Sequence, residues 1–231
     1  MSIQGPDAHH ISRVLRLETG DQIIVVSPDG DAGIGKITNI ALDTVELVLE
    51  ERIEEDKEAP VNVYLAQGLP KSDKMDYIVQ KAVELGIKGI YPMEAKHCVV
   101  QYDHAKKQSR QGRWQKIATE AAKQCGRTII PTVEPIAPLS VILENVTADT
   151  VVLMLYEGQT SQGIKQALVE HKAKNYLLLV GPEGGFSTNE VELCSDHGAH
   201  IVTMGPRILR TETAALAGVS LVMYEYGDLG G

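Results

Sequence analysis

The chain has 231 residues, of which 43% are hydrophobic and 23% charged, so it can build one large or two modest globular domains. Its net charge of −9 argues against a nucleic-acid-binding surface spread over the whole protein. No signal-peptide pattern and no apolar run near about 20 residues is present, which disfavours secretion and a spanning helix. Three widely spaced cysteines indicate a reducing compartment and argue against a disulfide framework or a zinc site. We therefore expect a cytoplasmic, membrane-free protein without a metal.

The N-terminal part of the chain, residues 1–49, is predicted to be a small all-β structure. Alternation of apolar and polar residues indicates half-buried strands, and Pro and Gly at 28–30 predict a turn after the first of them. The expected strands cover residues 22–27, 32–40 and 44–49. A short helix is expected before them, over residues 10–17, and carries Arg13 and Arg16.

A charged segment, residues 50–59, ends at Pro60 and predicts a boundary between domains 1–58 and 59–231. Beyond it, apolar strands near residues 61, 89, 151, 177 and 201 alternate with helical patterns. This alternation is typical of an α/β fold with a mostly parallel sheet covered on both faces. Helices are expected over residues 72–86, 103–124, 138–145, 162–172, 188–197 and 213–226, with Ser72 capping the first.

Positive charge is concentrated in residues 96–127, where eight basic side chains face two acidic ones. A local basic stripe on an acidic protein is compatible with steering RNA to one face. A solvated helix face explains the same charges equally well. Charge alone leaves both interpretations open.

Two buried-looking strands, residues 176–180 and 200–204, each run into a Gly-Pro loop that precedes a helix. Ligands bind at such strand ends in open α/β sheets, where glycines let the backbone come close to them. The first loop, GPEGG, lacks the spacing of dinucleotide and P-loop motifs, and the chain has no G-x-S-x-G elbow. A flat, uncharged ligand such as adenosine suits loops of this kind, although ordinary tight turns would explain them too.

The loop GPEGG at 181–185 together with ILRTETAA at 208–215 resembles the cofactor site of the SPOUT methyltransferases, and most nearly the RsmE family. Residues 71–86 and 114–131 also resemble that family. It methylates a uridine of 16S ribosomal RNA at N3. The resemblance implies S-adenosylmethionine as cofactor, the small ribosomal subunit as partner and a homodimer. It also implies a trefoil knot formed from about residue 150 onward and a PUA-like N-terminal β-barrel.

Residues in or beside the two loops are expected to bind the cofactor by this resemblance. They are Leu155, Val180, Gly181, Pro182, Glu183, Gly184, Gly185, Met204, Gly205, Ile208, Leu209, Thr213 and Ala214.

Methylation at N3 of uracil requires loss of a proton and stabilisation of the resulting anion. Arg210 is the best catalytic candidate, because its permanent charge and rigid donors precede the cofactor-facing helix. Glu212 is the second candidate and would orient Arg210 or the substrate, since an ordinary carboxylate is a weak general base. Thr211 or Thr213 is expected to cap the helix.

RNA contacts are expected from basic side chains that match family strings. They are Arg13, Arg16, Lys71, Lys74 and Arg127. Each is equally explained as an exposed surface charge. Family members carry an arginine near the start, whereas residues 1–8 here contain neither Arg nor Lys.

Two other functions remain open from the sequence. A SPOUT enzyme that methylates a ribose 2′-oxygen of RNA would use similar loops. A non-catalytic RNA-binding or ribosome-assembly factor would bind no cofactor. The N-terminal resemblance and ILRTETAA favour N3 methylation over the first, and the two intact loops count against the second.

Overall fold

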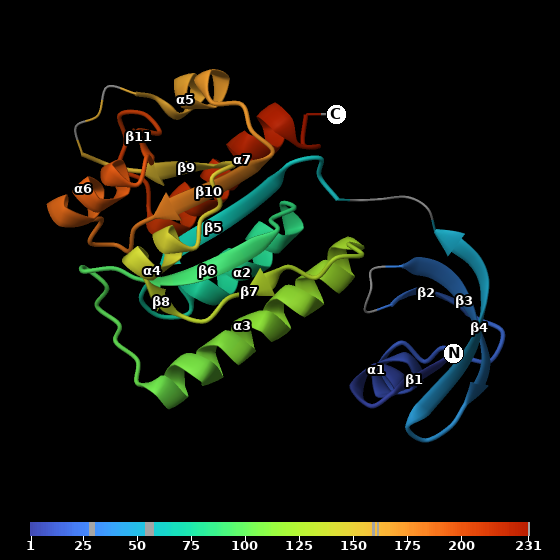
Figure 1. Ribbon diagram of the computed structural model, residues 1–231. Helices are drawn as coiled ribbons and strands as arrows, with labels where there is room; N and C mark the ends of the chain where they lie inside the picture. The colour runs from blue at the N-terminus through green and yellow to red at the C-terminus, as the bar shows by residue number, and fades with distance from the viewer. Residues whose placement is uncertain (28–30, 54–57, 159, 161, 231) are drawn as a thin grey trace. The chain divides into compact units, whose positions relative to one another are not determined.

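The computed structural model describes residues 1–27, 31–53, 58–158, 160 and 162–230 (Figure 1). The chain forms two compact units, Met1–Lys57 and Glu58–Gly231. The turn predicted at residues 28–30 lies outside the described residues.

The N-terminal unit is an antiparallel sheet in the order β1-β4-β3-β2, which curls around a short helix (Figure 1). Its core is small and consists of Ala8, Ile11, Ile37 and Val45. The three predicted strands are present, with one longer than expected, and β1 is an addition that sequence periodicity did not indicate. The elements are β1 Ser2–Gln4, α1 Pro6–His9, β2 Gln22–Val26, β3 Ala32–Ile40 and β4 Thr44–Ile53.

The prediction of a single helix over residues 10–17 is wrong. An α-helix begins earlier, at Pro6, and gives way to a π-helical turn, His10–Val14. Proline is favoured at a first helical position because its φ is already helical and its missing N–H has no intrahelical partner. Arg16 then takes a left-handed conformation with φ 53°, which prevents the helix from continuing to Leu17.

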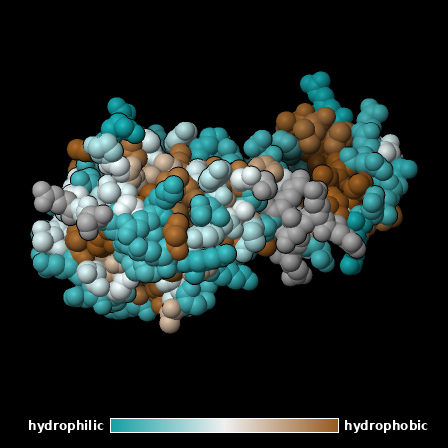
Figure 2. Space-filling model, turned by 90° about the horizontal axis from the view of Figure 1, so that it is seen from above, coloured by the Kyte–Doolittle hydropathy of each residue, from teal (hydrophilic) through white to brown (hydrophobic). Residues whose placement is uncertain are grey.

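Several aliphatic side chains of the N-terminal unit are exposed, including Ile24, Val26 and Val48. They lie on β2 and β4, where alternate residues face away from the small core. Figure 2 shows hydrophobic surface on one face of this unit.

The C-terminal unit is built around a parallel sheet in the order β11-β9-β10-β5-β6-β7, with β8 also paired to β6. The predicted alternation of strands and helices is confirmed. The two-residue strands β7 and β8 are too short to give a periodic signal. The strands are β5 Asn62–Gly68, β6 Gly89–Glu94, β7 Thr132–Val133, β8 Ala137–Pro138, β9 Thr150–Leu155, β10 Asn175–Val180 and β11 His200–Val202.

Helices cover both faces of this sheet (Figure 1). Side chains of α2, α3, α5 and α7 share one core with the strands, and those of α4 and α6 share the other. Successive residues of β10 point to opposite cores, as a strand buried on both faces requires. The helices are α2 Lys74–Glu84, α3 His104–Cys125, α4 Leu139–Glu144, α5 Ile164–Glu170, α6 Thr188–Asp196 and α7 Thr211–Tyr226.

Three helix starts differ from the sequence prediction, and one of them is α5, which begins at Ile164, two residues later than expected. Ser72 does not cap α2, because it takes a left-handed conformation with φ 58° and Asp73 occupies the N-cap position. The last helix begins at Thr211, two residues earlier than expected, with Arg210 at the N-cap. Neither Asp73 nor Arg210 contributes a side-chain hydrogen bond to its helix as an N-cap.

Candidate functional site

The carboxyl ends of four neighbouring strands meet at one edge of the C-terminal sheet. Val180 of β10 is paired with Leu155 of β9 on one side and with Gln67 of β5 on the other, and Val202 of β11 is paired with Leu155. Because all four strands are parallel, the loops that follow them emerge at the same edge. This register places both Gly-Pro loops at the same edge of the sheet, on either side of the end of β9.

The first loop, residues 181–185, lies against two other segments so closely that side chains are excluded. A Cβ on Gly68 would lie 2.6 Å from the Pro182 nitrogen. Gly185 has φ 66°, and a Cβ there would overlap the Glu157 carboxylate. The positive φ is strained for other residues, so the backbone conformation favours glycine at this position.

Hydrogen bonds attach the same loop to the segment that follows β6. His97 Nδ1 lies 2.9 Å from the Gly184 carbonyl oxygen. The Lys96 N–H donates to Glu190 at 2.8 Å, and Glu190 also closes a capping box with Ser187 at the start of α6. The loop therefore has a defined shape between β10 and α6.

A buried hydrogen-bonded chain joins the first loop to the start of α7. Gln67 Nε2 donates to Thr211 Oγ1 at 2.8 Å, and Thr211 Oγ1 donates to the Gly181 carbonyl oxygen at 2.6 Å. The capping role predicted for Thr211 is therefore wrong, since its hydroxyl bonds a different segment. Gln67 Oε1 is buried and has no hydrogen-bond partner among the described residues. Such an acceptor is costly unless a ligand or water uses it.

The second loop presents its side chains to the outside. Ile208 is 85% exposed, and Arg210 is exposed at the N-cap of α7. Gly205 has φ 108°, which allows the chain to turn after Met204. Leu209 and Ala214 are half-buried nearby in the chain, and Thr213 is exposed on the first turn of α7.

Lys74, at the start of α2, makes ion pairs with both loop regions. Its Nζ lies 2.9 Å from Glu183 Oε1 and 3.1 Å from Glu212 Oε2. The Lys71 N–H also donates to both Glu183 oxygens, at 3.2 and 3.3 Å. Glu212 Oε2 is buried and makes no aligned hydrogen bond, so its contact with Lys74 is chiefly electrostatic.

These contacts change the acidity of all three groups. The contact with Glu183 raises the pKa of Lys74 despite some desolvation, and Glu212 adds to the effect. Burial favours the neutral forms of both carboxyls. Lys74 and backbone hydrogen bonds outweigh burial, so the pKa values of Glu183 and Glu212 are lowered. The Arg210 charge also lowers the pKa of Glu212. Both carboxylates are therefore ionised at neutral pH.

The residues expected to bind RNA have different environments. Arg13, Arg16 and Lys71 are exposed, whereas the amine of Lys74 is shared between two carboxylates. Arg127 is only 7% exposed, and its guanidinium pairs with Glu58 and donates to the Val83 and Ile87 carbonyl oxygens. The geometry of Arg127 favours a structural role, which neither sequence interpretation included.

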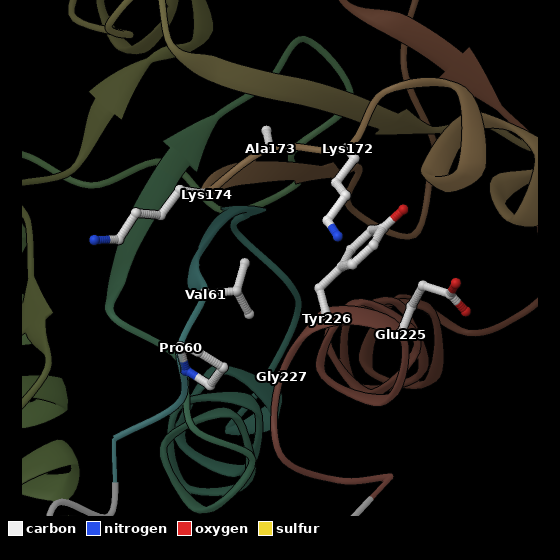
Figure 3. A pocket seen from close by; sticks show the side chains of 8 residues that line it. All are labelled: Pro60, Val61, Lys172, Ala173, Lys174, Glu225, Tyr226 and Gly227. Atoms are coloured by element: carbon white, nitrogen blue, oxygen red, sulfur yellow. The ribbon is translucent and has the colours of Figure 1, made fainter.

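A cleft of about 590 Å³ lies elsewhere, beside the amino ends of β5 and β10 and the end of α7 (Figure 3). Its lining includes Pro60, Lys172, Lys174 and Tyr226. A six-residue strand is about 20 Å long, so this cleft is well separated from the two loops. No group of metal-binding side chains occurs among the described residues, and none of the helices there is long and apolar enough to cross a membrane.

Sequence reasoning missed three contributors to this edge of the sheet, namely Gln67, His97 and the bridging role of Lys74. Gln67 carried a usable signal, because a polar residue ended an otherwise apolar strand just before a glycine. The other two act through contacts between segments distant in the sequence, and no local pattern marks them.

Comparisons with known proteins give a consistent result over nearly the whole chain. The family model for an RNA methyltransferase domain matches residues 57–223, and the model for an RNA methyltransferase PUA domain matches residues 3–50. The ribosomal RNA small subunit methyltransferase E of Bacillus subtilis (strain 168) is 37% identical, over 97% of this chain and 90% of that protein.

Two solved structures have the same fold, each with 30% identity and a TM-score of 0.89, covering 99% of this chain and 94% of theirs. One is the ribosomal RNA small subunit methyltransferase E of Neisseria gonorrhoeae bound to S-adenosyl methionine. The other is a methyltransferase from Legionella pneumophila in complex with the same cofactor. With both domains matched and the strand-end loops in place, the chain belongs to the ribosomal RNA small subunit methyltransferase E family.

Proposed function

We propose that this protein transfers a methyl group from S-adenosylmethionine to N3 of one uridine in the 16S RNA of the small ribosomal subunit. The observation that carries the proposal is the position of two Gly-Pro loops at the same edge of the parallel sheet, where they follow the two strands that flank β9, with Arg210 at the start of the helix after the second loop. Family membership supports the reaction and its RNA class.

The residues present fit the cofactor. The unpartnered Gln67 Oε1 is a buried acceptor, and an adenine amino group or an ammonium is the kind of donor it lacks. The glycines of the first loop leave backbone groups accessible without side-chain obstruction. We expect the cofactor to contact Leu155, residues 180–185 and residues 204–209, and the first turn of α7 at Thr213 and Ala214. The bound cofactor supplies an electrophilic methyl group and needs no metal.

Arg210 is the proposed catalytic residue. The uracil imide is a weak acid, so a fixed positive charge near O2 or O4 favours its N3 anion. Arg210 is exposed at the N-cap of α7 and is therefore accessible to an incoming base. The positive end of the α7 dipole lies at the same place and acts in the same direction.

Glu212 is proposed to orient the site and not to accept the N3 proton. Its pKa is lowered, and a carboxylate that holds its proton weakly is a poor general base. Its ion pair with Lys74 and its proximity to Arg210 suit it to fixing the first turn of α7.

RNA is proposed to bind through exposed cations on both units, with Arg13 and Arg16 on one and Lys71 on the other. We propose a cytoplasmic location on the same ground, because the proposed substrate is an RNA of the small ribosomal subunit. The protein's net charge of −9 makes local cationic groups more important for RNA binding than the overall field.

A homodimer is proposed, with α7 in its interface. This helix keeps Leu221 at 39% and Tyr224 at 67% exposure although its opposite side is buried in the core. A Tyr224→Asp variant should convert a dimer to a monomer, because a charge desolvated at an apolar interface is costly. Light scattering coupled to gel filtration measures the mass, and a wild-type monomer would contradict this assembly.

The chain from about residue 150 is also proposed to form the trefoil knot of SPOUT enzymes.

The test combines cofactor titration with analysis of the methylated product. Wild-type protein should bind S-adenosylmethionine in calorimetry and form N3-methyluridine on small subunits that lack the mark. Arg210→Ala should still bind the cofactor but lose most of the methyl transfer, since a group acting only in the transition state affects kcat. Arg210→Lys keeps the charge without the planar fork and separates these two contributions.

The alternative functions give different results in the same test. A 2′-O-methylated ribose in the product would show that the protein methylates ribose and not N3 of uracil. If the folded protein bound RNA but no cofactor, it would be an RNA-binding factor and not an enzyme.

A further inference from the structure

We infer that Lys74 is a positioning residue that fixes the first cofactor loop to the start of α7, and that it does not bind RNA phosphate. The inference rests on the proposed function, because it concerns how that site is held in shape. Its basis is a single ammonium group in contact with two carboxylates from segments that follow different strands.

The three partners come from three distant parts of the chain. Lys74 is the first residue of α2, Glu183 lies in the loop after β10, and Glu212 is the second residue of α7. The Lys71 N–H adds a second attachment to Glu183 from the segment before α2. The start of α2 is therefore the common anchor for both cofactor-site segments.

Electrostatics makes this anchor necessary. Glu183 and Glu212 are both ionised at neutral pH, and each lies within about 3 Å of the same Nζ, at 2.9 and 3.1 Å. Two carboxylates this close repel each other unless a cation lies between them. Removal of the Lys74 charge would therefore favour separation of the first loop from α7.

The Lys74 contacts supplement the buried hydrogen bond from Thr211 to Gly181. That bond joins the same two segments through the first residue of α7 and the first residue of the loop. The ion pairs join them one residue further along α7 and two residues further along the loop. With two attachments, the first loop and α7 cannot rotate relative to each other about a single contact. Arg210 precedes Thr211 and therefore lies next to both attachments.

The same geometry disfavours phosphate as a partner of Lys74. The positive charge of Lys74 is already balanced by the two carboxylates that its Nζ contacts, so little of it is left to attract a phosphate. Lys71 differs, since its side chain is exposed and only its backbone contacts Glu183.

The experiment compares Lys74→Met with Lys81→Met in the full-length protein. Lys81 is on the same helix and pairs with Glu84 at 2.8 Å, away from both loops, so it controls for loss of one lysine and one ion pair. We expect Lys74→Met to weaken S-adenosylmethionine binding about tenfold in calorimetry, corresponding to ~1.4 kcal/mol. Lys81→Met should bind as wild type.

Two further variants test the cause. Lys74→Arg keeps a cation that reaches two carboxylates and should recover most of the affinity. Lys74→Met combined with Glu183→Gln removes the repulsion and should bind the cofactor more tightly than Lys74→Met alone. In steady-state kinetics with small subunits, Lys74→Met should change the cofactor KM and kcat and leave the RNA KM close to the wild-type value.

An unchanged cofactor affinity with an RNA KM raised about tenfold would overturn the inference and identify Lys74 as an RNA ligand. Hydrogen exchange without cofactor tests the attachment independently of catalysis. The amides of residues 181–187 and 208–214 should exchange faster in Lys74→Met than in Lys81→Met, and equal exchange would also overturn the inference. Failure of the wild type to bind cofactor would refute the proposed function, while the exchange result would still decide the role of Lys74.

Discussion

Arg127 illustrates how one buried cation can connect three segments of the C-terminal unit. Its guanidinium pairs with Glu58 before β5 and donates to carbonyl oxygens at the end of α2 and just after it. The side chains of the pair are only 5% and 9% exposed. Removal of one partner of a buried ion pair is strongly destabilising, because the other charge stays buried without a partner. Replacement of both partners by apolar side chains costs much less.

Arg127→Met should therefore lower the free energy of unfolding by about 3–5 kcal/mol. The two carbonyl groups lose their donors and Glu58 loses the guanidinium. Urea unfolding followed by circular dichroism gives the change. Arg113→Met is the matched control, because Arg113 is 56% exposed and its pair with Asp76 should contribute only about 0–1 kcal/mol. Equal losses in the two variants would show that burial does not distinguish these arginines.

Which residues could be assigned from the sequence depended on whether their role was local. The glycines of the first loop were identified from their order and spacing, since a positive φ or a close backbone approach needs glycine. The environment of Arg127, by contrast, depends on Glu58, 69 residues earlier. Thr211 was assigned as a cap from its place before a helical pattern, and a contact with Gly181 overrode that local preference.

At the scale of elements, α7 packs unusually close to the sheet. Gly218, in the middle of the helix, faces Leu155 and Leu178, and a Cβ there would lie 2.9 and 3.3 Å from their Cδ1 atoms. Gly112, in the middle of α3, is exposed and a Cβ there would meet nothing within 4 Å. The two glycines occupy similar helical positions for different reasons.

The same substitution should therefore have opposite effects at these positions. Gly112→Ala should raise the free energy of unfolding by about 0.5–1 kcal/mol, because alanine reduces the entropy of the unfolded chain. Gly218→Ala should lower it by about 1–2 kcal/mol, because the added methyl forces Leu155 and Leu178 to move. Thermal unfolding of both variants beside wild type measures the signs, and stabilisation by Gly218→Ala would refute the close packing.

The connection between the first loop and α7 should depend on pH in a predictable direction. The pKa values of Glu183 and Glu212 lie below the ordinary value of 4.5, so their stabilisation is fully present above about pH 5. It is lost as the pH falls through the lowered pKa values. The raised pKa of Lys74 sets the upper limit, above its ordinary value of 10.5.

Thermal unfolding of wild type and of Glu183→Gln/Glu212→Gln between pH 7 and pH 3 measures this dependence. The stability difference between the two proteins should be constant at neutral pH and should fall in acid. A difference that stays constant down to pH 3 would mean that neither carboxylate has a lowered pKa.

At the scale of the whole molecule, the alternation of strands and helices could be predicted because parallel strands buried on both faces are continuous apolar runs. The strand order could not, because the register that pairs β10 with both β5 and β9 depends on long-range packing. The two-residue strands gave no pattern. The limit between the two units also depends on a long-range contact, since Glu58 pairs with Arg127 of the C-terminal unit.

A fragment containing residues 58–231 should fold on its own and bind S-adenosylmethionine, because the strands and loops of the candidate site all lie within it. A fragment of residues 59–231 should be less stable by about 3–5 kcal/mol, since it lacks the carboxylate that pairs with Arg127. Urea unfolding compares the two fragments. Identical midpoints would place the start of the unit after Glu58.

The sheet order also determines when this protein can fold during its own synthesis. One edge of β5 pairs with β10, so this pairing cannot form until β10 has been synthesised. The paired residues Asn62 and Asn175 are 113 positions apart. At elongation rates of about 5–20 residues per second, the delay is roughly 6–23 s. For that time an apolar strand edge is exposed on the nascent chain, and such edges pair readily with other strands. Translation speed and chaperone access should therefore influence the yield of this protein more than they would for a fold whose neighbouring strands are made in succession.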